Sequence, residues 1–584
     1  MTTVIKLPLV GPLYQNSDQI ATPGSYAPIM YNGYLSEAGS IRKVPGLATF
    51  ADTGTGQPVN GIFWDYNNSL LLAASNGKFY RYPSSAGTGR IDVSGGITLA
   101  TQTLRFASYE DANYGGVIFV ADGGKLNFLS ELPNVVSNGG TNYICIKLHP
   151  GSTAQSEPGV GTATATYWVA AAAWSVASVA YTVFQLRTNG GSTYRCDVAH
   201  TSAANTEPGV GALWQTVWTQ VAPVAWSATN TYYTSGVLEE IADADCPSAS
   251  SFVTVIDGYV HVNQDNTAQI WFSETNDWQT WAGEYVTAES QGDLIAAIDS
   301  GWNQLAVLGY QSFERFENDG VTPWSVNKPA SVPSGTIAKY SFCKFDNAWW
   351  WLDSNRQFIR LNGTLPQVVS TALAKIMAGI TNITDCIVTA VPVDGKPWML
   401  ITLPSEGRTW LYDVSQGVNG WSEVADWNSG TAEFEGWKVR EWIYSPQWNE
   451  VLCAGDDGII YKVDAETYYF GGTDSIRFER RTGEIDHGTR AWKRSHEVVL
   501  KLKRTSRAQE DTDFTMLLDW RDNGSATWSN ARTISLTKVG DTEFIAKVNR
   551  LGRYRTRQYR LIISDATTDW SLVDAEERVE VDRL

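Results

Sequence analysis

The chain has 584 residues, a formal net charge of −18 at pH 7, and 12% aromatic residues. That length is enough for several hydrophobic cores, so more than one domain is expected. An acidic average surface repels phosphate backbones and anionic lipids, which excludes general nucleic-acid or membrane-surface binding. No apolar run approaches the roughly 18 residues that a membrane helix needs, and the first residues do not resemble a signal peptide. We therefore expect no membrane span, and assembly in a cytoplasm.

Residues 1–55 are rich in Pro, Gly and Tyr and are predicted to form an extended N-terminal arm. After it, pairs of apolar runs are joined by short polar turns. Seven such turns are centred on Asn67-Asn68, Tyr114-Gly115, Asp257-Gly258, Ser300-Gly301, Asp346-Asn347, Asp394-Gly395 and Trp448-Asn449. With one exception they recur at roughly 40 to 50 residues, a period typical of β-propeller blades. The sequence predicts an all-β protein with a six- or seven-bladed β-propeller over residues 56–142 and 234–470.

The exception is a long gap between the second and third turns, which predicts an insert over residues 143–233. This insert has its own repeat. Tyr143-Ile144-Cys145 with His149 and Glu157-Pro158-Gly159-Val160-Gly161 recurs as Tyr194-Arg195-Cys196 with His200 and Glu207-Pro208-Gly209-Val210-Gly211. A small two-copy β module is therefore expected in a loop of the propeller.

Two kinds of ligand can be considered for the insert. Cys145, His149, Cys196 and His200 could bind zinc, but equivalent positions in two copies place each pair in its own copy. We therefore favour packed side chains and predict no metal and no cofactor. The flat rings of Trp168, Trp174, Trp214, Trp218 and Trp226 could stack on sugars, and the module resembles small carbohydrate-binding modules. The alternative is a structural or partner-docking role.

From about residue 471 the apolar runs become longer and carry charges, which predicts a separate C-terminal β-sandwich over residues 471–584. Between Arg477 and Arg560 there are 19 Lys/Arg and 11 Asp/Glu, a net of +8. Candidate assembly contacts are Lys501, Lys503, Arg504, Arg553, Arg555 and Arg557. A solvated face of mixed charge is the alternative.

Motifs for catalysis are missing from the sequence. There is no phosphate-binding Gly-rich loop and no nucleophile motif, and the five His residues lie outside any such context. The segment Asp522–Trp528 resembles the Asp-box of sialidases, but it occurs once and a hairpin turn explains it. We predict that the protein is not an enzyme, and a glycosidase is the weakest hypothesis.

Several motifs in order along the chain resemble one family. They are Lys6–Leu9, Asn32–Leu35, Ile41–Leu47, Gly301–Phe316, Trp410–Trp421 and His487–Arg494. Together they resemble the packaged-DNA stabilisation proteins of short-tailed phages, also called tail accessory factors, tail hubs or nozzles. The insert departs from the simplest members.

The resemblance implies a subunit of a ring, usually a hexamer, below the portal and adaptor of the virion tail, assembled in the host cytoplasm. Such a ring prolongs the DNA channel, helps to retain the packaged genome and anchors fibres, spikes or a needle. An acidic channel wall would let double-stranded DNA slide without specific binding. The alternative is a tail protein that binds host-surface glycans through the insert.

Overall fold

The protein is built almost entirely from β-strands. The computed structural model describes residues 2–16, 26–36, 39–111, 115–130, 133–147, 149–151, 155–182, 184–196, 199–228, 231–232, 236–288, 291–320, 324–326, 331–393, 395–472, 474–504, 515–535, 543–564 and 570–582. Within these ranges the α-helices are α1 (Thr164–Tyr167) and α2 (Ala374–Gly379). The prediction of an all-β protein is confirmed. No helix in this part of the chain is long and apolar enough to cross a membrane.

Seven four-stranded antiparallel meanders occur within the described residues. Four consist of consecutive strands: β6–β9 (Val59–Asp65, Leu70–Ser75, Lys78–Tyr82, Ile91–Asp92), β26–β29 (Val253–Ile256, Tyr259–Asn263, Gln269–Phe272, Tyr285–Thr287), β30–β33 (Ile295–Gly301, Gln304–Gly309, Phe313–Glu317, Ser325–Val326) and β34–β37 (Cys343–Phe345, Ala348–Leu352, Phe358–Asn362, Leu365–Val368). A fifth is β38–β41 (Ile387–Val393, Lys396–Leu403, Arg408–Asp413, Trp421–Asn428), which begins a larger sheet.

The other two meanders take their last strand from a distant part of the chain. In one, β10 (Arg105–Asp111), β11 (Gly115–Ala121) and β12 (Asn127–Ser130) are followed by β25 (Leu238–Glu240). In the other, β43 (Val439–Ser445), β44 (Glu450–Gly455) and β45 (Ile459–Asp464) are completed by β5 (Gly46–Asp52). Strand β5 directly precedes the first meander in the chain, yet it completes the last meander.

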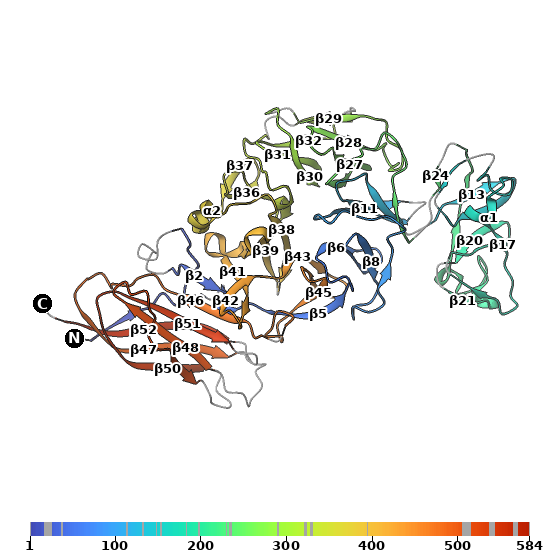
Figure 1. Ribbon diagram of the computed structural model, residues 1–584. Coiled ribbons are helices and arrows are strands. Elements are labelled where there is room, and N and C mark those ends of the chain that lie inside the picture. Colours follow the sequence, from blue (N-terminus) through green and yellow to red (C-terminus); the bar gives the residue numbers. More distant parts are fainter. Residues whose placement is uncertain are drawn as a thin grey trace.

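The meanders are arranged in a cycle, which Figure 1 shows from one face. Strand β43 contacts β6, β6 contacts β10, β10 contacts β26, and β26 contacts β30. The short 3-10 helix η4 (Lys339–Ser341) contacts β30 and β38, and β38 contacts β43, which completes the cycle. The predicted turns lie at the connections between the first and second strands of the meanders, although Tyr114 and Asp394 lie outside the described residues. The turn predicted at Ser300-Gly301 is displaced, because these residues end β30 and Trp302-Asn303 form the turn. Apolar clusters fill the space between adjacent sheets, for example Trp64 and Leu71 with Leu452.

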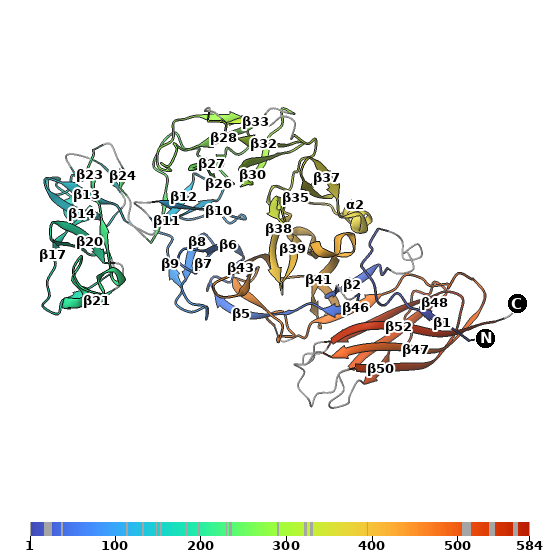
Figure 2. The same cartoon turned by 180° about the vertical axis from the view of Figure 1, so that it is seen from behind.

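The N-terminal segment does not form a separate arm, which corrects the boundary predicted at residue 55. Strand β1 (Thr2–Lys6) pairs with β52 (Trp570–Val581), and β4 (Ile41–Lys43) pairs with β3 (Gly33–Leu35) and β52. Both chain ends consequently lie at the tip of the C-terminal domain (Figure 1 and Figure 2). The two pairings with β52 join residues more than 500 positions apart and leave no local signal in the sequence.

One continuous sheet joins the propeller-like part to the C-terminal domain. Strand β2 (Ile29–Tyr31) pairs with β41 on one side and with β46 (Arg477–Arg481) on the other, within a ten-stranded sheet. Asn32, fully buried at φ 58°, follows β2. Its Nδ2 donates to the carbonyl oxygens of Ala425 (2.8 Å) and Arg477 (2.9 Å), and its Oδ1 accepts from the Ala425 N–H at 3.0 Å. The two parts are therefore linked by main-chain pairing as well as by a connecting segment.

The C-terminal domain consists of two packed sheets. One contains β3, β4, β52, β47 (Lys493–Arg504), β50 (Glu543–Tyr554) and β1, and the other continues from β46 through β51 (Arg557–Ser564), β48 (Thr515–Asp522) and β49 (Arg532–Ser535). Buried side chains from both sheets, such as Val498, Leu500, Met516 and Leu561, share one core. The two sheets therefore pack face to face around a shared core.

The insert contains two modules, but they are not simply consecutive. The first has the sheet β16–β14–β13–β23 (Trp168–Ala170, Thr141–Cys145, Val135–Asn138, Val224–Ala225) and the pair β15–β24 (His149–Pro150, Thr231–Tyr232). The second has β17–β19–β20–β22 (Ala172–Ala173, Leu186–Asn189, Ser192–Cys196, Trp218–Val221) and β18–β21 (Ala180–Tyr181, His200–Thr201). The chain thus leaves the first module, completes the second and returns to finish the first. The insert also begins at β13, before the predicted boundary at 143.

Candidate functional site

Two of the five candidate glycan-stacking tryptophans are core residues of the insert. Trp168 is 2% exposed and Trp218 is 1% exposed. Their indole N–H groups donate to the carbonyl oxygens of Ser156 (2.7 Å) and Thr206 (2.9 Å). The prediction that these two rings stack on a sugar is wrong, because so small a module needs them to fill its interior.

The other three tryptophans are half-buried. Trp226 packs against the apolar cluster of the first module, and Trp174 and Trp214 pack against that of the second. Trp214 meets the ring of Tyr194 edge-to-face, with centroids 5.5 Å apart. Each of these three rings is therefore partly covered by its own module, and stacking of a sugar on them stays a prediction.

The two Cys–His pairs lie in separate modules. Cys145 Sγ is 3.9 Å from His149 Nδ1, and Cys196 Sγ is 3.8 Å from His200 Nδ1. Burial raises the pKa of the Cys145 thiol to about 12 and lowers the pKa of His149. Each pair belongs to the aromatic core of its own module, so the four side chains do not converge on a common zinc site. No cluster of three or more potential metal ligands occurs among the described residues.

Most of the basic candidate contacts in the C-terminal domain are already paired within the chain. Lys501 Nζ is 3.4 Å from Asp574, and Lys503 Nζ is 3.0 Å from Glu543. Arg553 pairs with Asp582. The side chain of Arg504 lies outside the described residues. Lys501, Lys503 and Arg553 therefore offset part of the net charge of +8 within the chain.

Arg557 is fully buried, so the prediction that it contacts a partner is wrong. Its guanidinium donates to both carboxylate oxygens of Asp522, at 2.6 and 2.8 Å, and to the Leu551 carbonyl at 2.8 Å. This bidentate pair holds β51 against the end of β48. Arg557 is a structural residue of the sandwich.

Arg555 is exposed, unlike Arg557. Its Cζ lies 5.0 Å from the centroid of the Trp492 ring, and the Cζ of Arg553 lies 5.4 Å from the same centroid. Trp492 remains 38% exposed. An exposed tryptophan flanked by arginines has the composition of a protein-interaction hot spot.

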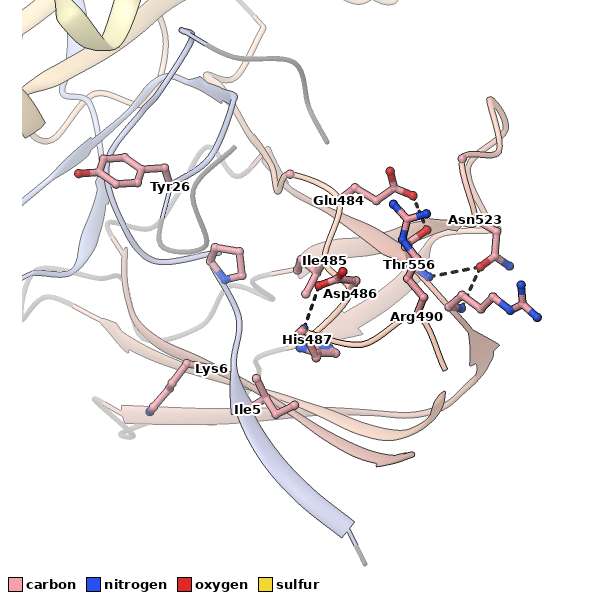
Figure 3. Close-up of a pocket in the computed structure, with 15 residues that line it drawn as sticks. Ile5, Lys6, Tyr26, Glu484, Ile485, Asp486, His487, Arg490, Asn523 and Thr556 are labelled. Atoms are coloured by element: carbon pink, nitrogen blue, oxygen red, sulfur yellow. Dashed lines mark hydrogen bonds between the residues drawn. The ribbon is translucent and has the colours of Figure 1, made fainter. Parts of the chain in front are cut away.

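A cavity of about 710 Å³ opens beside Arg555. Its walls are the N-terminal strand at Ile5 and Lys6, the loop 483–490, and the turns at Asn523–Gly524 and Arg555–Thr556, as Figure 3 shows. The loop is fixed on β51, because the N–H of Ile485 donates to the Arg557 carbonyl (2.8 Å) and the reverse bond is 3.0 Å. The Asn523 side chain accepts from the Arg555 N–H at 2.8 Å, which joins the two turns.

His487 anchors this loop to the interior of the sandwich. It has a positive φ of 53°, an uncommon conformation for a residue with a side chain. Its Nε2 lies 2.9 Å from the Tyr554 hydroxyl and 3.2 Å from the Glu577 carboxylate. Burial raises the pKa of Glu577, but hydrogen bonds from His487, Ser495 and Tyr559 outweigh it, so the pKa lies below its ordinary value. The motif His487–Arg494 indicated this loop, whereas Glu577 and Tyr554 lie too far along the chain to be found by motif.

A second polar cluster crosses the centre of the cycle of meanders. Arg105 on β10 donates from Nη1 to Glu441 on β43 at 3.0 Å and from Nη2 to the Tyr340 carbonyl at 2.9 Å. The sheets of β10 and β43 are not neighbours, because β6–β9 lies between them. Burial raises the pKa of Glu441, and Arg105 partly offsets this effect. These side chains therefore occupy the space around the axis.

The match to known proteins places the chain in one family. The family described as bacteriophage P22 Gp10, β-propeller, a phage stabilisation family, matches residues 149–468, just over half of the chain. The crystal structure of the WD40 β-propeller domain of Doa1 aligns with 71% of this chain and 96% of its own length, at 8% identity and a TM-score of 0.32. Among curated proteins, none matches this chain.

Proposed function

Because this chain belongs to the phage stabilisation family of the P22 Gp10 β-propeller, we propose that it is a tail hub or nozzle subunit of a short-tailed phage. In this proposal several copies form a ring, usually six, below the portal and adaptor. The ring extends the DNA channel, helps to retain the packaged genome and anchors fibres, spikes or a needle. The family match to a phage stabilisation protein is the observation that carries the proposal.

The cycle of meanders supports this role as a wall. We infer that the seven meanders are the blades of a seven-bladed propeller, closed by β5 on β45 in the last blade. Because β5 precedes the first blade in the chain and pairs with β45 of the last blade, this pairing links the two ends of the propeller. A closed propeller supplies a stiff block with few free sheet edges, which suits a subunit of a channel wall.

The ion pair at the propeller axis supports a DNA path outside the individual propeller. Arg105, Glu441 and Tyr340 join three different parts of the propeller across its centre. In the proposed ring, a duplex would pass along the axis of the ring of subunits and not through an individual propeller. The net charge of −18 makes the ring repel the phosphates, so DNA can slide instead of binding.

The rigid link between the two domains supports assembly. The ten-stranded sheet continues from the propeller into the C-terminal sandwich, so the sandwich is held at a defined angle. A ring needs such fixed geometry, because small angular errors accumulate around a closed circle of subunits. The insert lies at the opposite end of the molecule in Figure 1, away from the sandwich.

The proposal is tested by locating the protein in the particle. Phage particles would be produced with a peptide tag on the insert, labelled with antibody fragments, and imaged at the tail vertex. We expect a ring of labels around the DNA path. We also expect that particles made without the protein lose their packaged DNA. Labels on the capsid shell, or DNA-filled stable particles without the protein, would contradict the proposal. Glycan binding by the insert receives no support from its half-buried and buried tryptophans.

A further inference from the structure

The cavity beside Arg555 contains two positive charges that the chain leaves available. Arg490 and Arg555 are both exposed and line the cavity. Neither pairs with a carboxylate among the described residues. The third cation of the lining, Lys6, already pairs with Asp574 at 2.5 Å and Glu576 at 2.8 Å. Lys501, Lys503 and Arg553 outside the cavity are likewise paired. Arg490 and Arg555 are therefore the arginines of the lining that have no carboxylate partner among the described residues.

The acidic residues of the cavity already have hydrogen-bond partners. Asp486 accepts from the N–H of Gly488 at 2.9 Å, which shapes the loop. Glu484 accepts from the hydroxyl of Thr556. Both carboxylates serve to hold the walls together. Both carboxylates remain in the lining, and the guanidinium groups of Arg490 and Arg555 are the side chains there that can donate charge-assisted hydrogen bonds to carboxylates of a ligand.

The walls of the cavity are fixed before any ligand arrives. Lys493 is fully buried, and its ammonium donates to the carbonyl oxygens of Thr489 (2.5 Å) and Ala491 (3.0 Å). His487 is held by Tyr554 and by buried Glu577. The loop that carries Arg490 is thus attached at both of its ends. A site with fixed walls loses little conformational entropy when it binds a partner.

Trp492 extends the site at its rim. It is exposed at 38% and is flanked by the guanidinium groups of Arg553 and Arg555. An aromatic ring beside arginines can pack against the aliphatic part of a bound peptide while the arginines meet its carboxylates. With a volume of about 710 Å³, the cavity is within the range of sites that bind ligands of a few residues.

We propose that this cavity, with Trp492 at its rim, is a docking site for an extended acidic peptide segment of another virion protein. Arg490 and Arg555 would bind side-chain carboxylates of that segment, and Trp492 would pack against its backbone. The inference deepens the proposed function and rests on it for the identity of the partner as a virion protein. Binding of an acidic peptide by the isolated chain does not depend on that function.

The test uses the full chain and a fluorescein-labelled peptide of eight glutamates, measured by anisotropy at physiological salt. An octa-lysine peptide and an uncharged Gly-Ser peptide serve as comparisons. We expect binding of octa-glutamate alone. Arg490→Glu and Arg555→Glu should each weaken it about tenfold or more, as expected for loss of a charge-assisted hydrogen bond. Trp492→Ala should weaken it less, because it keeps both charges.

Arg532→Glu is the matched control, since Arg532 is exposed on β49 of the same domain and does not line the cavity. Equal weakening by Arg532→Glu, or no binding of octa-glutamate by a correctly folded chain, would overturn the proposal. If the chain also binds a DNA duplex, and Arg490→Glu weakens this binding as much as it weakens peptide binding, the cavity is a general anion site. That result would also overturn the proposal. Self-association lost in Arg490→Glu would assign the site to a second copy, against the proposal. If the chain binds the peptide but is not found at the tail vertex, the peptide site is supported and the proposed role in the virion tail is rejected.

Discussion

Arg105 Nη1 lies 3.0 Å from Glu441 Oε1, although their strands belong to sheets that are separated by another sheet. The side chain of Arg105 is 19% exposed and that of Glu441 is 6% exposed. Since a buried carboxylate is costly without a partner, the pair fixes the distance between the two sheets. It gives the propeller a cross-link at its centre that no apolar contact between neighbouring sheets provides.

The first prediction concerns this pair. Arg105→Ala leaves Glu441 buried without its partner and should lower the free energy of unfolding by about 3–5 kcal/mol. The double variant Arg105→Met/Glu441→Leu removes both charges and should be much closer to the native chain. Urea unfolding followed by tryptophan fluorescence measures both. A single variant as stable as the double variant would show that the pair contributes nothing.

The second prediction concerns Asp426 on β41. Burial raises the pKa of this carboxyl from 3.8 to about 7; Lys438 partly offsets this, and Asp456 and Asp457 add to it. A folded-state pKa above the unfolded value gives a stabilising contribution that is complete below pH 4 and is lost as the pH rises to about 7. At pH 8 the ionised group should cost at most about 4 kcal/mol.

Asp426→Asn removes this titration. We expect the melting temperature of the native chain, relative to that of Asp426→Asn, to fall between pH 4 and pH 7 and to be level above pH 8. Differential scanning fluorimetry across this range measures the difference, and Asp474→Asn serves as the control because Asp474 is exposed. A constant difference across the whole range would contradict the prediction.

The third prediction concerns Asn32 at the junction of the two domains. Asn32→Ala removes three hydrogen bonds and leaves the carbonyls of Ala425 and Arg477 without them. The loss should be about 3 kcal/mol, with a further contribution from a positive φ that alanine tolerates poorly. Asn32→Gly keeps the backbone conformation and isolates the hydrogen bonds. Limited proteolysis should cut near the junction sooner in both variants than in the native chain, and unchanged cutting would contradict a role for this residue.

The fourth prediction concerns the independence of the insert. The N–H of Gly236 donates to the Ser130 carbonyl at 3.0 Å, so the two ends of the insert lie side by side. Replacing residues 133–235 by a short Gly-Ser linker should leave the unfolding of the propeller unchanged within about 1 kcal/mol, because loop length costs little. Trp168→Ala should destabilise the insert alone by about 3–5 kcal/mol. A chain without the insert that fails to fold would contradict this independence.

The sequence predicted those features that repeat locally. The seven turns and the Cys-x3-His repeat of the insert recur at fixed spacing, so the all-β meanders and the two modules could be expected from pattern alone. The destinations of β1 and β5 could not, because each pairs with a strand more than 400 residues away. The return of β23 to the first module could not be predicted either, because its partner β13 lies far before it in the chain.

The site residues show a different limit of sequence reasoning. A count of charges marks the C-terminal domain as basic, but it does not show that Lys503 faces Glu543 or that Arg557 is buried against Asp522. Pairing of side chains depends on the register of neighbouring strands. Arg555 keeps its exposed position because it lies in the turn between β50 and β51, and Arg490 because it lies in a loop.

The pairing of the first strands with the last also sets an order of events during synthesis. Strand β5 leaves the ribosome early, yet its partner β45 follows about 410 residues later, and β1 waits for β52 at the very end. Contacts of such long sequence separation form slowly and leave early segments exposed meanwhile. A chain that stops before β45 cannot complete the last meander, and one that stops before β52 cannot complete the sandwich. Only a finished polypeptide can therefore pair all of its early strands.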